Sequence, residues 1–312
     1  MKTRFALTLM AISLAMTQSI ASAQGLTELA DAAAVVSPSP AIGVAAIEQI
    51  HPPPAPDPCM ASDVAATPTR PNWSTGAQTT QCNVIEFDSG WLRQPMGHGV
   101  DQTLFPSSVR YGLTPKLDLR WGMLGPVVQS GGGESAVHGV TDQWFSARYR
   151  FLDQSHWTPA LALSYGFKDA TANPAKGFGS GYADHNLIFI ASRDFGRAHF
   201  DFNTVGILAG APHGEEGAAQ YGLALSVAVT KKFAWMLESD GGPQPGTSDR
   251  YGAALTGGSY TVRPWLVVDG AYTRVYTDCS PHALYSVGFT FARRSPFAPI
   301  GAGSRLAHWL GR

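Results

Sequence analysis

The feature that most restricts the fold of this chain is an alternation of side chains with a period of two. In residues 160–167, four large apolar side chains alternate with Ala, Ser and Gly, and residues 221–230 and 284–291 repeat the pattern. Residues 117–123 alternate apolar side chains with charged ones and Gly. Because successive side chains of a strand point to opposite faces, this period predicts β-strands with one apolar face.

About twelve such segments lie between residues 83 and 293, an even number that suits a closed bacterial barrel. They begin near Val84, Thr103, Leu117, Asp142, Pro159, Tyr182, Ala198, Gln220, Phe233, Arg250, Trp265 and Leu284. A soluble sandwich would also alternate, so the connections between the segments have to separate the two folds.

The connections sort by length into two alternating classes. Short turns are expected at 113–116, 154–157, 196–197 and 231–232, and long loops at 94–102, 127–141, 170–181, 210–219, 241–249 and 276–283. Residues 256–264 are longer than their place in this order predicts. Short turns at one end and long loops at the other favour an all-β fold, an antiparallel transmembrane β-barrel of the outer membrane.

The N-terminus indicates export. Lys2 and Arg4 precede a short apolar run that ends in small residues at Ala21 to Ala23, which predicts a secretory signal peptide over residues 1–23. No later stretch is long and apolar enough for a transmembrane helix. Charged residues are 14% of the chain, below the usual share of soluble domains, which favours the bacterial outer membrane as the location.

The barrel of residues 83–293 is flanked by two segments of different character. Residues 24–82 are rich in Ala and Pro, which predicts a mostly disordered periplasmic arm, and residues 294–312 form a C-terminal tail. Export would oxidise cysteines, so Cys59 and Cys82 are expected to pair, which leaves Cys279 as an unpaired thiol.

The polar faces of the strands converge on the barrel interior. The side chains placed there by parity are Glu86, Asp88, Arg110, Asp118, Arg120, Arg148, Arg150, Asp184, His199, Asp201, Asn203, Glu238, Asp240 and Asp269. They form either a selectivity lining for a permeant or a set of paired charges that fills the centre. Trp91, Trp144, Trp157, Trp235 and Trp265 lie near strand ends and are expected in the interfacial girdles.

No other chemistry is indicated. A formal net charge of -1 predicts no nucleic-acid partner, and the spacing of Cys and His predicts no metal site. We expect no cofactor and no enzymatic activity. His199 and Asp201 could serve an outer-membrane lipid hydrolase only with a serine in reach on the lipid-facing wall, but parity places His199 inside.

Two stretches resemble a known family. They are TRPNWSTGAQTTQC at residues 69–82 with the following VIEFDSGW, and the run from VRYGLTPKLDLRWG at Val109 through DQWFSARYRF and TPALALSYGF to SRDFG. They resemble the outer-membrane meta-pathway of phenol degradation family, whose members are described as transporters. The resemblance covers most of residues 69–293 and implies a barrel that aids passage of aromatic or other small molecules.

Two functions therefore remain open from the sequence. The first is passive transport or uptake of a small solute, aromatic and apolar solutes included, with outer-membrane lipid as surroundings. The second is a structural or interaction barrel with a plugged lumen. A plugged barrel predicts that Arg110, Arg120, Arg148 and Arg150 each meet a carboxylate across the interior. The sequence leaves the oligomeric state open.

Overall fold

A computed structural model describes residues 59, 61, 63–277 and 281–297 of the chain. The expected signal peptide, Cys279 and all but the start of the expected tail lie outside these residues. The described residues all belong to one compact unit, which spans residues 55–312.

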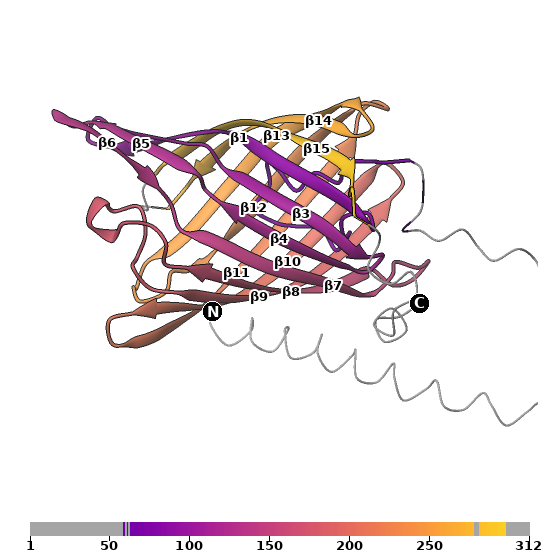
Figure 1. Ribbon diagram of the computed structural model, residues 1–312, viewed down its shortest axis with the longest axis horizontal. Helices are drawn as coiled ribbons and strands as arrows, with labels where there is room; N and C mark the ends of the chain where they lie inside the picture. The colour runs from indigo at the N-terminus through magenta and orange to yellow at the C-terminus, as the bar shows by residue number, and fades with distance from the viewer. Residues whose placement is uncertain (1–58, 60, 62, 278–280, 298–312) are drawn as a thin grey trace, which may run out of the picture. The chain divides into compact units, whose positions relative to one another are not determined.

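The described residues form one antiparallel sheet of 15 strands that closes on itself through pairing of β1 with β15 (Figure 1). The first seven strands are β1 (Val84–Gly97), β2 (Val100–Leu104), β3 (Ser107–Thr114), β4 (Leu117–Met123), β5 (Pro126–Gly131), β6 (Glu134–Val140) and β7 (Gln143–Leu152). The others are β8 (Ala160–Asp169), β9 (Asp184–Phe195), β10 (Ala198–Ala211), β11 (Gly214–Ala228), β12 (Phe233–Pro243), β13 (Arg250–Arg263), β14 (Leu266–Val275) and β15 (Ala283–Arg294). A short 3-10 helix, η2 (Pro174–Lys176), lies between β8 and β9.

Six of these strands are halves of three interrupted barrel strands. β2 and β3 are separated by Phe105 and Pro106, β4 and β5 by Leu124 and Gly125, and β6 and β7 by Thr141 and Asp142. Pro106 lies in the first break and Pro126 directly follows the second, and neither can donate an N–H to the ladder. With each pair of halves counted once, the described ring has twelve strands, in the order β15-β14-β13-β12-β11-β10-β9-β8-β7-β4-β3-β1. The predicted closed barrel of about twelve strands is confirmed.

Several predicted loops are strand instead. Residues 256–264, expected as a long connection, continue β13 to Arg263, and the register pairs Arg263 with Leu266. Most of the predicted loops 94–102, 127–141 and 210–219 form hairpins. Strand beyond the bilayer faces water on both sides, so its sequence needs no apolar alternation and reads as a loop.

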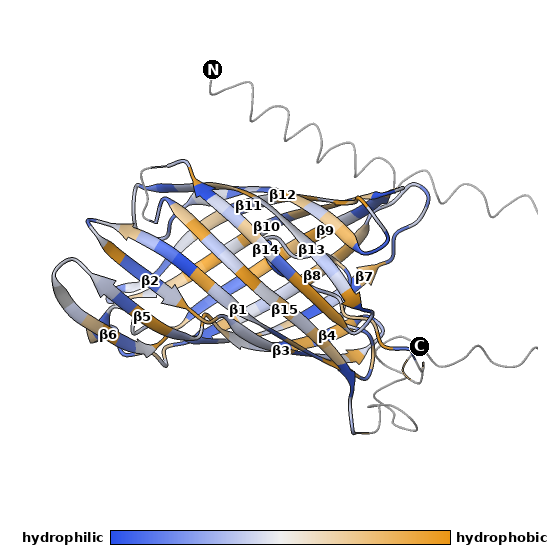
Figure 2. Ribbon diagram, turned by 90° about the horizontal axis from the view of Figure 1, so that it is seen from above, coloured by the Kyte–Doolittle hydropathy of each residue, from blue (hydrophilic) through white to orange (hydrophobic). Residues whose placement is uncertain are grey.

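The outer surface of the barrel is apolar and exposed. Leu163, Tyr165, Leu223 and Val287 are 41%, 50%, 53% and 54% exposed, whereas inward-facing Ala162 is fully buried. Apolar and polar bands are interleaved along many of the strands (Figure 2). No helix among the described residues is long and apolar enough to cross a membrane. An apolar outer wall around a polar interior is what a bilayer requires of a β-barrel.

Candidate functional site

A segment of the chain before β1 occupies the barrel interior. Residues 63–82, here called the lumen segment, precede β1, and Ala77 and Thr80 in it are fully buried. The prediction that this part of the chain belongs to a mostly disordered periplasmic arm is therefore wrong. A Pro- and Thr-rich segment cannot build a core of its own, but here the polar wall of the barrel supplies its partners.

Wall side chains accept hydrogen bonds from the backbone of the lumen segment around most of the ring. Buried backbone N–H groups need acceptors, and carboxylates make strong ones. The bonds run from Thr67 N to Glu86 Oε1 (2.8 Å), Trp73 N to Glu238 Oε2 (2.8 Å), Thr75 N to Asn203 Oδ1 (2.8 Å), Ala77 N to Ser192 Oγ (2.7 Å) and Thr80 N to Asp118 Oδ2 (2.7 Å). Five strands, β1, β4, β9, β10 and β12, thus hold one segment.

The periplasmic end of the lumen segment is tied covalently. Cys59 and Cys82 form a disulfide, the pairing expected from the sequence. Arg294 Nη1 donates to Cys59 O (3.0 Å), and Ser295 N donates to Asn83 O (2.9 Å). The end of β15 therefore fastens the same region.

Two of the four lumen arginines pair with carboxylates, in each case on the neighbouring strand rather than across the interior. Arg110 is almost fully buried and pairs with Glu86 and with Asp88, the latter at 3.1 Å. Arg148 pairs with Asp118 and donates to Gly76 O in the lumen segment (2.8 Å). A buried charge that lacked such partners would be costly.

The other two arginines do not follow the prediction for a plugged barrel either. Arg150 pairs with Asp153 (2.8 Å), which follows the end of β7 rather than facing it across the lumen. Arg120 donates to Ser108 Oγ (3.2 Å), and its guanidinium carbon lies 4.7 Å from the ring centre of Trp144. Trp144 shares the inward parity of Arg148, so its expected place in a girdle is wrong.

The remaining candidate residues lie in separate parts of the lumen. His199 lies between Asp194 (2.7 Å) and Asp201 (3.0 Å), and the hydroxyl of Ser192 also donates to Asp201. Within the described residues no serine hydroxyl bonds to His199, as a hydrolase would need.

Asp269 lies 3.6 Å from Arg70 of the lumen segment. Towards the end of β8, Lys168 pairs with Asp184 (2.7 Å) and Asp142 (3.4 Å). Asp240 is 5% exposed and makes no ion pair among the described residues. Those residues also include no group of three or more His, Cys, Asp and Glu side chains that could hold a metal ion.

The loop between β8 and β9 packs against strands β2, β5 and β6. Phe178 is 9% exposed and clusters with Ala172, Leu104 and Val127. Lys176 Nζ donates to His138 O of β6 (2.8 Å). This loop therefore supports the part of the wall formed by β2, β5 and β6.

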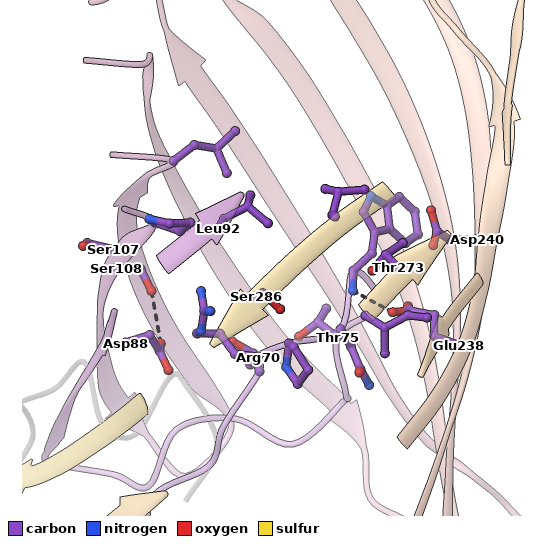
Figure 3. Close-up of a pocket in the computed structure, with 18 of the residues that line it drawn as sticks. Arg70, Thr75, Asp88, Leu92, Ser107, Ser108, Glu238, Asp240, Thr273 and Ser286 are labelled. Atoms are coloured by element: carbon purple, nitrogen blue, oxygen red, sulfur yellow. Dashed lines mark hydrogen bonds between the residues drawn. The ribbon is translucent and has the colours of Figure 1, made fainter. Parts of the chain in front are cut away.

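A cavity of about 320 Å³ remains beside the lumen segment. Its lining includes Trp73 and Arg70 of the segment together with wall residues from opposite sides of the ring. Figure 3 shows Asp88, Ser108 and Leu92 on one side and Glu238 and Asp240 on the other. The interior is thus crossed by the segment but not filled.

Sequence reasoning missed the residues that the lumen segment contributes and the small polar residues of the wall. The segment has no periodicity, so only the first stretch of the family resemblance, residues 69–82, marked it. Ser108 and Ser192 show the same inward parity as the charged residues but were not singled out because serine is common on any polar face. Their parity was the available signal.

The fold and the outer surface define the class: this is an outer-membrane β-barrel. A comparison with solved structures gives an outer membrane channel from Pseudomonas putida F1, at 14% identity over 70% of this chain and 98% of the other, with a TM-score of 0.54. It also gives the NanC porin, at 8% identity over 66% of this chain and 98% of the other, with a TM-score of 0.46. No family model and no curated protein sequence matches the chain. At this sequence identity, the similarity to the channel shows a shared fold and nothing more.

Proposed function

We propose that the protein is a passive channel for a small solute and that the lumen segment limits its bore. The observation that carries this is the cavity of about 320 Å³ that remains beside the segment, lined by charged and aromatic side chains. Pockets of this size hold small molecules. A barrel packed solely for stability would fill such a space with paired side chains.

The family resemblance supports the same proposal. The stretches that carry it include TRPNWSTGAQTTQC, which is the part of the lumen segment that holds Arg70 and Trp73. We propose on this basis that the chain is related to that family. Aromatic solutes fit the indole groups of Trp73 and Trp144, both of which line the cavity.

A second candidate is the plugged barrel without transport. The observation that favours it is the set of hydrogen bonds from the lumen segment to five strands. The lumen arginines do not add to it. Arg110 and Arg148 pair with carboxylates of the neighbouring strand, and neither Arg120 nor Arg150 meets a carboxylate across the lumen among the described residues.

Liposome swelling with purified protein separates the two. The channel predicts uptake of small sugars and exclusion of large ones. It also predicts faster uptake by a variant with Glu238→Ala and Asn203→Ala, because both side chains hold the segment. Lys231→Gln, in the exposed turn before β12, is the matched control. If neither the wild type nor the anchor variant admits any solute or carries current, the plugged barrel stands instead.

A further inference from the structure

The charges that line the cavity do not all cancel. Of the charged residues in its lining, Asp88 pairs with Arg110 and Arg70 lies beside Asp269. Glu238 has no ion pair among the described residues but accepts two backbone N–H groups of the lumen segment. Arg120 and Asp240 remain, since neither has an ion pair within the part of the chain that the structure describes. One is positive and the other negative, and both line the same cavity.

Arg120 is held in place without a direct ion pair. The carboxylates whose charges reach it, Asp88 and Asp118, pair directly with Arg110 and Arg148 instead. The Nε and Nη2 atoms of Arg120 donate to Ser108 Oγ at 3.3 and 3.2 Å, and its guanidinium stacks on Trp144 at 4.7 Å. A neutral hydroxyl and an indole face orient a guanidinium without cancelling its charge. A carboxylate arriving from the cavity can therefore still form a charge-assisted pair with it.

Asp240 is the unpaired negative group of the cavity. It is only 5% exposed, and its Oδ2 atom has no hydrogen-bond partner among the described residues. Glu238, two residues before it on the inner face of β12, already accepts the backbone N–H groups of Trp73 and Ser74. Two neighbouring carboxylates with no cation between them favour an ammonium group from a ligand.

The two groups lie on opposite walls. β4 carries Arg120 and β12 carries Asp240, and five barrel strands separate them in either direction around the ring. Twelve tilted strands about 4.8 Å apart enclose a barrel roughly 24 Å across between backbones. After the reach of an arginine and an aspartate is subtracted, roughly 10 to 15 Å remains for a ligand.

This span excludes several ligand classes. An α-amino acid has both charges on one carbon and cannot meet both walls. A simple anion or a simple cation would leave one of the two protein charges without a partner, which costs binding free energy. An extended chain of three residues spans roughly 10 Å, so a short peptide has its two ends at the needed separation.

We propose that the cavity binds a small zwitterion with well-separated charges, a di- or tripeptide in the first instance, its carboxylate at Arg120 and its ammonium group at Asp240. Trp73 gives the middle of the ligand an apolar surface, because its side chain is 41% exposed inside the barrel and lines the cavity. The proposal deepens the channel function, on which its physiological meaning rests, but binding itself does not require transport.

The test uses the detergent-purified full chain and isothermal titration calorimetry with three forms of one peptide. The free tripeptide Ala-Phe-Ala carries both charges, its N-acetyl form lacks the ammonium group, and its C-terminal amide lacks the carboxylate. The wild type should bind the free peptide at least about tenfold more tightly than either blocked form, since each loses one charge-assisted pair.

Two variants assign each end of the peptide. Asp240→Asn should abolish the preference for the free over the acetylated form and keep the preference for the free acid over the amide. Arg120→Gln should do the reverse. Arg150→Gln is the matched control, because Arg150 is a lumen arginine that pairs with Asp153 and does not line this cavity. Circular dichroism and the mobility of unboiled samples verify that each variant is folded.

Equal affinity of the wild type for all three forms, or no binding of any, would overturn the proposal. An unbranched omega-amino acid of the same extended length distinguishes a general zwitterion site from a peptide site. If that compound binds as tightly as the free peptide, the site recognises extended zwitterions in general rather than peptides alone. Peptide binding without solute uptake into liposomes would defeat the channel function and leave the binding site intact.

Discussion

At the scale of single residues, one step along a strand changes the solvent that a side chain meets. Leu163 of β8 is 41% exposed on the outer wall, whereas Ala162 beside it is fully buried inside. The pleat alone produces this difference, because adjacent side chains point to opposite faces. The inward residue has to be small where the lumen segment passes, and Ala77 of that segment packs against Ala162 and Ile190.

Replacing Leu163 with Arg should lower the free energy of unfolding by roughly 2 to 4 kcal/mol, the cost of a cation on the lipid face near the bilayer midplane. Leu225→Arg should behave similarly. The effect is measured by urea unfolding in lipid vesicles.

The comparison is with Arg at Ala162 or Ala224, which would crowd the lumen. These two variants should release the lumen segment from its wall contacts, detected as faster proteolysis of residues 63–82. Identical behaviour of the four variants in both measurements would contradict the assigned facing of the strands.

The alternation of side chains along a strand explains which parts of the candidate site could be predicted from the sequence. Ten of the fourteen lumen candidates are buried, as an inward position requires, because a strand has a fixed period and each strand was long enough to show it. Trp144 was misplaced since tryptophan suits both an interfacial girdle and a lumen wall. The contacts of Arg120 with Ser108 and Trp144, and the lack of an ion pair at Asp240 among the described residues, could not be predicted, because contacts inside a barrel depend on the register between strands.

At the scale of elements, the lumen segment is the part that sequence patterns could not reveal. Its order comes from hydrogen bonds to the wall rather than from periodicity or a core of its own. The hairpin tips were obscured for a related reason, since strand in water on both sides carries no apolar face. The fold was thus predictable where lipid imposes a pattern and unpredictable where it does not.

The position of the lumen segment inside the barrel depends on Gly222 of β11. A Cβ atom at Gly222 would lie 2.8 Å from Trp73 Cζ3, closer than packed atoms approach, and would also meet the Ser74 hydroxyl. Gly222→Leu should therefore loosen the segment and raise hydrogen exchange at residues 73–77. At Gly206 of β10 the nearest atom, Leu187 O, is 3.9 Å away, so Gly206→Leu is the control. Unchanged exchange in Gly222→Leu would show that the segment is not seated there.

Two periplasmic connections are joined by an exposed ion network. Asp153 Oδ2 lies 2.9 Å from Lys116 Nζ, and its other oxygen lies 2.8 Å from Arg150 Nε. The hydrogen bond from Lys116, together with the charge of Arg150, holds the pKa of Asp153 below its usual value. The stabilisation is present above the ordinary pKa of an aspartate, about 3.9, and is lost as the pH falls through the lower folded value.

Lys116→Gln should raise the pKa of Asp153 towards the ordinary value, as followed by NMR titration of the carboxyl carbon. Lys232→Gln, in the turn between β11 and β12, removes an equal charge that makes no ion pair with Asp153 and should leave the pKa of Asp153 unchanged. The same pKa in Lys116→Gln as in the wild type would mean that the network does not form in solution. The stability effect is expected to be small because both partners are partly exposed to solvent.

At the scale of the whole barrel, closure depends on one seam. β1 and β15 pair over ten registered positions, from Val84 with Arg294 to Arg93 with Tyr285. Every other neighbour in the ring is adjacent or nearly adjacent in sequence, so this seam joins the two ends of the described sheet. A closed ladder leaves no unpaired edge in the bilayer, which gives such barrels their resistance to detergent.

Closure of the barrel predicts that the folded protein resists unfolding by detergent. The folded protein should fractionate with outer membranes and migrate differently on gels before and after boiling, because the closed barrel resists unfolding by dodecyl sulfate. A variant that lacks residues 283–294 loses β15 and the seam, so it should migrate identically under both conditions. A variant in which a short Gly-Ser turn replaces residues 129–137 removes the tip of the hairpin of β5 and β6, where β6 pairs with no strand but β5 among those described. That variant should keep the heat-dependent shift. Loss of the shift in the tip variant and its retention without β15 would contradict the assignment of the seam, and recovery of the wild type as a soluble periplasmic protein without detergent would contradict the membrane barrel itself.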